Sequence, residues 1–196
     1  MFLDSVGIIL KKNDSSMHKV TILDKIHGKI ECVTLYHAFS VGSLITYIMR
    51  CEKSVYFIND ISLIYTPLSL AQVDILFFHH ILELVYHFTH VGNYTNDLFN
   101  LFAFLYATEQ NMITALYKKF FLLKLLSCMD TMPEQDNLHT SVMAKLNNTD
   151  IKHLVTISIN KSDEQELDRW LWSCVWQHPY VNKFKTVHFL AENRTV

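Results

Sequence analysis

Several features that mark common classes of protein are scarce in this sequence of 196 residues. Four glycines and three prolines leave little room for a glycine-rich phosphate loop or a turn-dense β-sandwich. A surplus of positive charge is also missing, because 17 Lys and Arg residues stand against 19 Asp and Glu residues, a formal net charge of -2. Non-specific nucleic-acid binding needs many surplus cations, so any binding of a polyanion must come from a local patch.

Cysteine pairs, secretion signals and long apolar runs are missing too. No C-x-x-C pair indicates a zinc site or a small disulfide framework, so we expect reduced core thiols in a cytosolic protein. The N-terminus has no basic segment ahead of an apolar one, and no uninterrupted apolar run reaches about 18 residues. We therefore expect a cytoplasmic protein without a membrane partner. The cysteines are Cys32, Cys51, Cys128 and Cys174.

Catalytic motifs are equally absent from the sequence. There is no G-x-S-x-G, Walker loop, H-E-x-x-H or dinucleotide fingerprint, so we predict neither an enzyme nor a cofactor. One stripe, His80, Glu83, His87 and His90, has the three- and four-residue spacing of a helix face that could bind zinc or iron. Because we find no second helix with ligands, we predict no metal and keep a metal-dependent hydrolase as a distant alternative.

What the first third contains is a series of strand patterns. β-branched runs and alternating apolar residues predict five short strands, with Asn59 and Asp60 as a bulge or kink in the last. No helix-length pattern interrupts them, which favours a small closed barrel or a sandwich. The predicted strands cover residues 5–12, 18–23, 30–35, 43–49 and 54–65.

After Pro67 the apolar spacing changes to three and four residues, which indicates helices. A capping-box pattern at Ser162 predicts the start of a helix that reaches residue 177, and a last helix follows to residue 192. The fold class is therefore α+β, with a β-rich domain over residues 1–66 and a helical domain over residues 67–196. Further predicted elements are helices over residues 70–91, 95–107 and 111–128, and one short strand near 153–159.

Several segments are informative through their order along the chain: Gly7-Ile8-Ile9-Leu10-Lys11, then Val20-Thr21-Ile22-Leu23-Asp24 with His27-Gly28-Lys29-Ile30, then Lys118-Lys119-Phe120-Phe121-Leu122-Leu123-Lys124-Leu125-Leu126 with Met132-Pro133, and finally Val181-Asn182-Lys183-Phe184-Lys185-Thr186. Together they resemble the RecO family of bacterial DNA repair and recombination mediators. That resemblance implies an oligonucleotide-binding (OB) barrel followed by a helical domain. It also implies a non-enzymatic protein that binds single-stranded DNA and single-strand-binding protein, anneals strands, and loads a recombinase with a RecR-like partner.

The sequence departs from that family in two places. The family commonly has a basic turn after its third strand, but residues 36–43 contain neither Lys nor Arg, so we expect only weak binding of single-stranded DNA. Many members also carry a four-cysteine zinc module, whereas residues 133–160 contain no cysteine. We therefore expect a shortened member without zinc.

The predicted barrel carries cations interleaved with the aromatic residues Tyr36, Tyr47, Tyr56 and Phe57. OB barrels bind single strands through a basic groove and aromatic faces on which bases stack. The alternative is an ordinary solvated edge, where Lys prevents strand pairing. The candidate DNA-binding residues are Lys11, Lys12, Lys19, Lys25, Lys29, Arg50 and Lys53.

Two further groups are candidates for partner binding. The resemblance implies that Lys118, Lys119 and Phe120 receive the acidic, aromatic-ended tail of single-strand-binding protein, and that Lys183 and Lys185 lie in a family-like basic turn. The alternative for the first group is the exposed face of an amphipathic helix. A protein-interaction module that has lost DNA binding is accordingly the main alternative function. Trp172 and Trp176 share a predicted helix face. This face either packs in the core or forms a groove for a partner.

Overall fold

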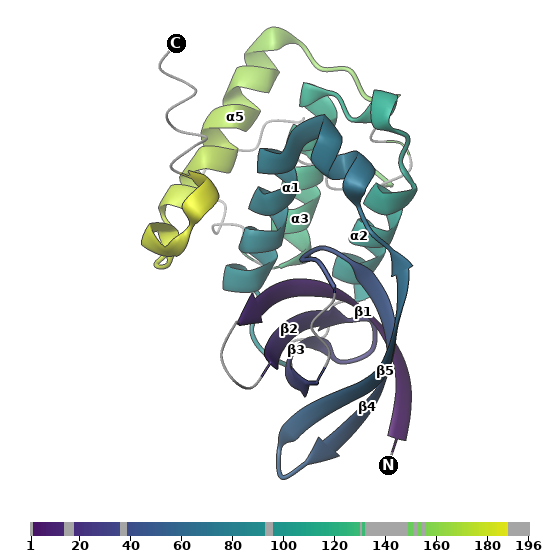
Figure 1. Ribbon diagram of the computed structural model, residues 1–196. Coiled ribbons are helices and arrows are strands. Elements are labelled where there is room, and N and C mark those ends of the chain that lie inside the picture. The colour runs from purple at the N-terminus through teal and green to yellow at the C-terminus, as the bar shows by residue number, and fades with distance from the viewer. Residues whose placement is uncertain are drawn as a thin grey trace. The chain divides into compact units, whose positions relative to one another are not determined.

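Five strands at the N-terminus close into a barrel in this computed structural model, which describes residues 2–13, 18–35, 39–92, 96–129, 131, 149–150, 153 and 156–187 (Figure 1). Around the barrel the order is β1-β2-β3-β5-β4, and β4 also pairs with β1. Only β3 and β5 run parallel; the other four pairs are antiparallel. The strands are β1 (Phe2–Asn13), β2 (His18–Asp24), β3 (Gly28–Thr34), β4 (Leu44–Glu52) and β5 (Val55–Tyr65).

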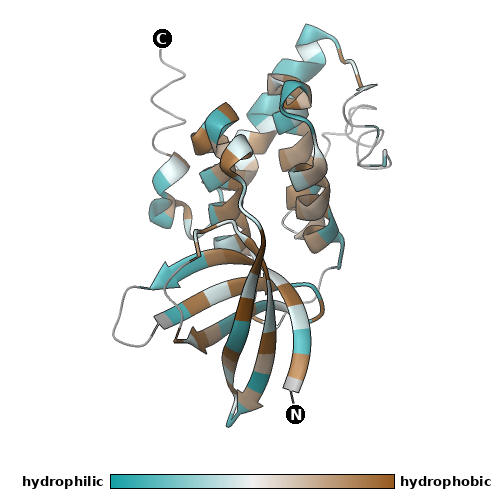
Figure 2. Ribbon diagram, turned by 45° about the vertical axis from the view of Figure 1, so that its right-hand side comes forward, coloured by the Kyte–Doolittle hydropathy of each residue, from teal (hydrophilic) through white to brown (hydrophobic). Residues whose placement is uncertain are grey.

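Alternation of apolar and polar residues explains why these segments form a barrel (Figure 2). In β3, Ile30 and Cys32 are buried while Glu31 between them is exposed. Because every second side chain points inward, closing the sheet buries one apolar row from each strand and leaves no free edge. The interior is formed by Ile9, Val20, Ile22, Ile30, Cys32, Ile45, Tyr47, Met49 and Ile58.

The predicted bulge in the last strand is confirmed. Between the pairs Thr46↔Ser62 and Ile48↔Asn59 the register shifts, and Asp60 has a positive φ of 47°. Aspartate tolerates this left-handed conformation better than most residues do. The extra residue increases the bend of β5, which helps the strand to curve around the barrel.

Helices make up the described residues beyond the barrel. The hydroxyl of Thr114 caps the third by accepting from the backbone N–H of Tyr117, and the Asn160 side chain caps the last by accepting from Asp163. Asn160, and not Ser162, is therefore the N-cap, a correction of two residues. The helices are α1 (Leu68–Phe88), α2 (Asn96–Ala107), α3 (Ala115–Cys128) and α5 (Lys161–Trp176), with short 3-10 turns at Gln110–Met112 and Val181–Lys183.

The expected α+β class, with an OB-type barrel followed by helices, is thus confirmed. The predicted short strand is not found where it can be checked, because residues 156–159 are described and are not in a strand. Of the predicted last helix, residues 181–183 form a 3-10 turn and residues 185–187 are helical, and residues 188–192 lie outside the described residues.

Helix α1 is interrupted at Asp74, whose backbone (φ -161°, ψ 95°) is not helical. Its carboxylate accepts a hydrogen bond from the backbone N–H of Phe77 at 2.9 Å, so Asp74 caps the second part of the helix. By length and composition alone α1 is apolar enough to cross a membrane, a test that core helices also pass. Within the first turns of this apolar helix, however, the structure has the charged side chain of Asp74 as a cap.

The chain forms two compact units, and α1 contributes to both. The barrel unit consists of Met1–Leu68 and Leu82–Phe99, and the helical unit consists of Ser69–Ile81 and Asn100–Val196. The second part of α1 and the start of α2 thus belong to the same unit as the barrel.

Aromatic side chains form the core of the helical unit. Phe121 is fully buried and meets the rings of Phe77 and Phe102 edge to face, with ring centroids 6.0 Å and 6.2 Å apart. Such edge-to-face pairs add about 1 kcal/mol each to the free energy of burial. The high apolar fraction of the sequence is used here to pack helices against one another.

Candidate nucleic-acid interface

Strand register assembles one row of side chains on the outer surface of the barrel. Asn13 of β1 pairs with Lys19 of β2, and Lys19 pairs with Val33 of β3. Val33 pairs with Phe57 of β5, and Phe57 pairs with Arg50 of β4. Paired residues project from the same side of a sheet, so five strands contribute to one continuous row. We call Asn13, Lys19, Val33, Phe57 and Arg50 the rim row.

The rim row points outward. Its members are exposed or half-buried, whereas their chain neighbours Val20, Cys32, Met49 and Ile58 are buried in the barrel. The Arg50 guanidinium lies 5.9 Å from the centre of the Phe57 ring. The half-buried Phe57 ring beside a cation is the combination on which bases stack while their phosphates are neutralised.

The turn between β4 and β5 adds another cation beside this row. Lys53 and Ser54 both have positive φ angles, 47° and 67°, and Glu52 pairs with Val55 on either side of them. This is the backbone twist that a two-residue hairpin requires. Lys53 is exposed, and in OB barrels the β4–β5 loop and the face of β2 and β3 form the ligand surface.

Acidic residues limit the positive charge of this surface. Glu52 lies 3.2 Å from Nε of Arg50, and Glu31 is exposed on β3 two residues before Val33. The rim row with Lys53 therefore carries three cations close to two carboxylates.

Lys29, a predicted DNA contact, has a structural role instead. It is 8% exposed, and its ammonium donates to the backbone carbonyls of Tyr86 and Thr89, at 2.8 Å in the second case. These carbonyls end α1, where cations are favoured by the helix dipole. Burial lowers the pKa of Lys29, repulsion from Lys11 lowers it further, and attraction to Glu31 acts in the opposite direction.

Lys11, Lys12 and Lys25 lie outside the rim row. The Lys11 ammonium is 4.5 Å from the centre of the Tyr86 ring. Lys25 is exposed in the β2–β3 turn, six residues from Lys19, which is about 20 Å along an extended strand. The predicted set of seven cations is therefore not one patch.

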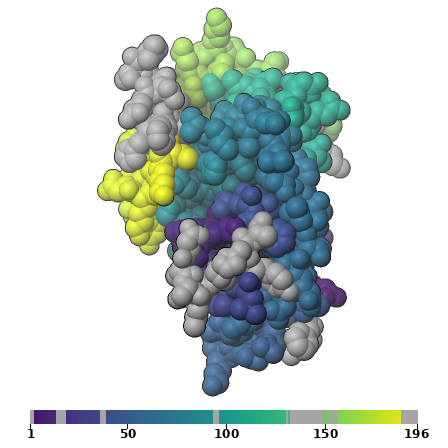
Figure 3. Space-filling view, viewed as in Figure 1, coloured from purple at the N-terminus to yellow at the C-terminus, as the bar shows by residue number. Residues whose placement is uncertain are grey.

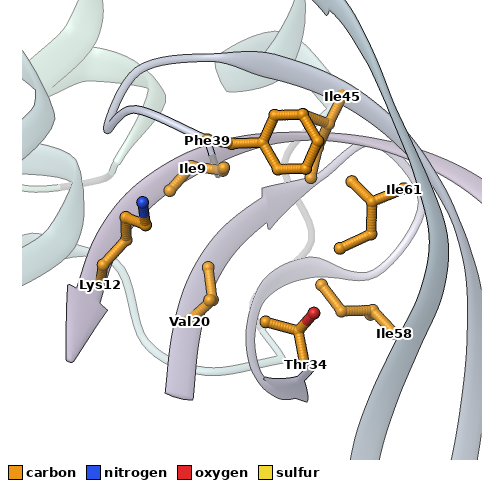
Figure 4. Close-up of a pocket in the computed structure, with 8 residues that line it drawn as sticks. All are labelled: Ile9, Lys12, Val20, Thr34, Phe39, Ile45, Ile58 and Ile61. Atoms are coloured by element: carbon orange, nitrogen blue, oxygen red, sulfur yellow. The ribbon is translucent and has the colours of Figure 1, made fainter. Parts of the chain in front are cut away.

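Lys12 lines a small pocket at one end of the barrel (Figure 4). The volume is about 10 Å³, which is room for about one water molecule and not for a base. We conclude that this pocket is a packing gap of the barrel core. The other lining residues are Ile9, Val20, Thr34, Phe39, Ile45, Ile58 and Ile61.

A buried carboxylate, which the sequence reasoning missed as a central residue, organises the barrel interior. The hydroxyls of Ser5 and Tyr47 donate to Oδ2 of Asp24. The backbone N–H groups of Ile26 and His27 donate to Oδ1 at 2.8 Å and 2.6 Å, and Nδ1 of His27 lies 2.8 Å from the same oxygen. Asp24 thereby shapes the β2–β3 turn as it ties that turn to β1 and β4.

These contacts also set the titration of Asp24. Burial alone raises the pKa of this carboxyl, but hydrogen bonds from Ser5, Tyr47 and His27 outweigh burial, so its pKa lies below the ordinary value. Burial and the charge of Asp24 raise the pKa of Tyr47, which therefore stays protonated and donates. A signal for this network exists in the sequence, namely an aspartate that ends an apolar strand just before a turn.

Gly7 makes room for this network. A Cβ atom at Gly7 would lie 2.3 Å from Cγ2 of Ile22 and 3.1 Å from the hydroxyl of Tyr47. A larger residue would therefore push Tyr47 away from Asp24. The glycine of the family-like first strand thus has a packing reason in this chain.

The predicted receptor for an acidic tail is occupied by contacts within the helical unit. Lys118 binds Asp74 at 2.6 Å, and Lys119 binds Glu164 at 2.6 Å and Asp168 at 2.9 Å. Phe120 is fully buried, so no open apolar pocket adjoins these cations at this residue. An acidic tail would have to displace these carboxylates before it could bind.

The titration of these groups agrees with their contacts. Burial alone lowers the pKa of Lys119, but its bonds to Glu164 and Asp168 outweigh burial and raise it. Burial alone raises the pKa of Asp74, but the hydrogen bonds from Lys118 and Phe77 outweigh burial, so the pKa lies below its ordinary value. The Asp74 carboxylate and the Lys119 ammonium therefore stay charged near neutral pH.

The two remaining partner candidates, Lys183 and Lys185, are exposed. The ammonium of Lys183 lies 4.4 Å from the centre of the Tyr180 ring. These residues are separate from Lys118 and Lys119 in their contacts, so the predicted partner residues do not form one described cluster.

The histidine stripe does not form a metal site in the described part of the chain. His80 is buried and its Nδ1 lies 2.9 Å from the hydroxyl of Thr186, whereas His90 comes after the end of α1. No three His, Cys, Asp or Glu side chains come together among the described residues.

None of the four described cysteines forms a disulfide, and only some of them are core thiols as predicted. Cys32 and Cys174 are buried, and burial raises their pKa to about 12 and about 11. Cys51 is exposed in β4, so the prediction of a core thiol is wrong there.

Comparison with known proteins gives no relative for this chain: no protein-family model and no curated protein matches its sequence.

Proposed function

We propose that the barrel binds single-stranded DNA weakly at the rim row and Lys53, as part of a DNA repair and recombination mediator similar to RecO. The observation that carries the proposal is the continuous outer row in which Lys19 and Arg50 lie on either side of Val33 and Phe57. In this arrangement a base stacks on Phe57 while neighbouring phosphates meet Lys19 and Arg50. Stacking on an aromatic ring contributes about 1–3 kcal/mol per base and tolerates any sequence.

Weak binding follows from the charges around the row. Arg50 already has Glu52 at 3.2 Å, and Lys29 is bound to backbone carbonyls. A strand therefore meets few available cations, and the expected dissociation constant is about 10 μM or weaker at physiological salt. Weak binding suits a mediator, because the strand must be passed on to a complementary strand or to a recombinase.

The proposal does not use Lys118 and Lys119 as the site for single-strand-binding protein, because both are bound to carboxylates. Contacts with that protein and with a RecR-like partner belong to the same proposal. Lys183 and Lys185 are exposed candidates for them. A protein-interaction module without DNA binding is the alternative, and the small positive charge of the rim row favours it.

Fluorescence anisotropy with a labelled oligothymidylate, at low and at physiological ionic strength, tests the barrel site. We expect Phe57→Leu to weaken binding about tenfold, because leucine keeps the apolar volume and removes the stacking face. Arg50→Met should weaken binding and reduce the slope of log affinity against log salt by about 0.7. Lys25→Met is the matched control, since Lys25 is an exposed barrel lysine outside the rim row.

Two outcomes would contradict the proposal. If the chain does not bind the oligonucleotide even at low ionic strength, the interaction-module alternative is preferred. If Lys25→Met and Arg50→Met weaken binding equally, the charge of the whole barrel matters and the rim row does not. Annealing of complementary strands covered with single-strand-binding protein then tests the mediator role separately.

A further inference from the structure

The end of α5 presents aromatic rings to solvent. Trp176 is 46% exposed and Tyr180 is 44% exposed. Trp172 is half-buried one turn before Trp176, and the two indole rings are stacked, with centroids 6.1 Å apart and planes at 27°. Residues near 180, yellow in Figure 3, lie at the surface in that view. Large exposed aromatic rings of this kind are uncommon unless they bind something.

These rings are held in place from the other side. Leu167 and Cys174 are buried on the opposite face of α5, which fixes the helix. The His178 ring lies 5.5 Å from the Tyr180 ring and 6.4 Å from that of Phe184, which is 1% exposed. The aromatic surface is therefore ordered before any ligand arrives, which lowers the entropy lost on binding.

Cations adjoin the rings. Lys183 places its ammonium 4.4 Å from the centre of the Tyr180 ring. Arg169 is exposed three residues before Trp172 and seven before Trp176, a spacing that puts all three on one helix face. We call Arg169, Trp172, Trp176, Tyr180 and Lys183 the α5 platform.

Two acidic residues of α5 form ion pairs with α3. Glu164 and Asp168 both bind Lys119 of α3, so the ammonium offsets one of their two negative charges within the helical unit. The residues that flank the platform, Gln165 and Gln177, are uncharged and exposed. The surface thus combines flat aromatic rings with cations, the combination on which unpaired bases stack while their phosphates are neutralised.

We propose that the α5 platform is a second binding site, which takes unpaired bases of a single-stranded nucleic acid. One base stacks on the exposed Trp176 ring and another on Tyr180, while Arg169 and Lys183 meet the phosphates. This site lies in the helical unit and does not depend on the rim row.

Tryptophan fluorescence tests this site directly, because Trp170, Trp172 and Trp176 are the three tryptophans of the chain and all lie on α5. Titration of the full chain with unlabelled oligothymidylate at low ionic strength should quench the emission in a saturable manner. Strand binding at the rim row brings no base onto a tryptophan and should leave the emission unchanged.

Variants then locate the contact. Trp176→Leu should remove most of the quenching and weaken its midpoint about tenfold. Lys183→Gln should shift the midpoint to higher oligonucleotide concentration and make it less dependent on salt. Trp170→Phe is the matched control and should keep the quenching, because Trp170 is half-buried two residues from Trp172 and lies on another face of α5. Circular dichroism melting shows whether Trp176→Leu is folded.

Three results would contradict the proposal. No quenching at low ionic strength, with anisotropy still reporting binding, would assign the strand to the barrel alone. Quenching that persists in both Trp176→Leu and Lys183→Gln would place the strand away from the platform. A blue shift with vesicles of phosphatidylglycerol and phosphatidylcholine, without any effect of oligothymidylate, would assign the platform to a lipid surface. Phe57→Leu should change anisotropy and not quenching, which separates this proposal from the one for the barrel.

Discussion

Asp24 and Lys29 in the barrel unit are buried charges whose partners are mainly uncharged groups, whereas Lys118 and Lys119 in the helical unit meet carboxylates. Asp24 accepts from two hydroxyls and two backbone N–H groups, together with the His27 ring. Lys29 donates to two carbonyls. The helical lysines are 23% and 20% exposed, and each lies within 3 Å of an acidic oxygen.

This difference predicts how each unit tolerates a change of charge. The backbone partners of a buried charge accept one sign only, because N–H groups cannot accept and carbonyls cannot donate. An ion pair between two side chains can be reversed, because both partners are replaceable. The barrel should therefore depend strongly on the identity of its inner charges, and the helical unit should depend on charge balance.

The largest effect is expected for Asp24→Ala. This change leaves the Ser5 and Tyr47 hydroxyls and two backbone N–H groups without their partner inside the barrel. We expect the free energy of unfolding to fall by about 4 kcal/mol. Urea denaturation followed by circular dichroism measures it. Asp4→Ala, at an exposed aspartate of β1, is the control and should change stability by less than about 0.5 kcal/mol. Equal losses in both variants would contradict the role of Asp24.

The same carboxylate should make the barrel sensitive to acid. Because the folded pKa of Asp24 lies below its unfolded value, its contribution is complete above the unfolded pKa, about 3.9, and is lost as pH falls through the folded pKa. In Asp24→Asn no carboxyl titrates here, so the stability of this variant should decline less over that acidic window. Denaturation series at several pH values compare the two slopes. A parallel decline would mean that other carboxyls dominate.

Much of the barrel could be predicted from local pattern, as β3 illustrates. Ile30, Glu31 and Cys32 alternate in the sequence and in burial, and Asp60 occupies the bulge that Asn59 and Asp60 predicted. The strand pattern left a closed barrel and a sandwich open, and the resemblance to OB barrels favoured the barrel. Local alternation contains no information about which distant strands pair, and the parallel pair of β3 and β5 joins residues 24 positions apart, Val33 and Phe57.

The site was harder to predict for the same reason. The rim row depends on the pairing of β3 with β5, two strands that are not adjacent in the sequence, so the sequence alone could not place Lys19 and Arg50 in one row. Lys29 occupies an outward position, where solvent was expected, but Tyr86 and Thr89 cover it. A lysine is available for binding only when no distant element reaches it, and periodicity does not report that.

The second largest effect is expected for Lys29→Met, which keeps the length of the side chain and removes its donors. The carbonyls of Tyr86 and Thr89 then lose a charged partner at the end of α1. We expect a loss of about 2 kcal/mol in the free energy of unfolding. Thermal and urea unfolding of Lys29→Met and Lys25→Met compare a buried with an exposed lysine. If both lose the same amount, the ammonium of Lys29 does not stabilise the helix end.

A smaller loss of stability, which a second substitution can partly compensate, is expected in the helical unit. Lys119→Glu places three acidic side chains together with Glu164 and Asp168, and should lower stability by about 1 kcal/mol after allowance for partial exposure. Glu164→Lys in the same chain restores a pair of opposite charges and should recover part of this loss. A double-mutant cycle measures the coupling between the two positions. No recovery in the double variant would mean that the pair is held by packing and not by charge.

The smallest effect on folding, and a clear effect on binding, is expected at Lys19. This side chain is exposed in the rim row, where it pairs with Asn13 and Val33. The next two residues of β2, Val20 and Thr21, are buried. Lys19→Met should therefore change the free energy of unfolding by less than about 0.5 kcal/mol. If a phosphate meets Lys19, the slope of log affinity against log salt should fall by about 0.7. Unfolding and anisotropy measured on one preparation separate these outcomes. A large loss of stability would show that Lys19 has an internal role like that of Lys29, and the distinction between exposed rim cations and inner charges would then fail for the barrel.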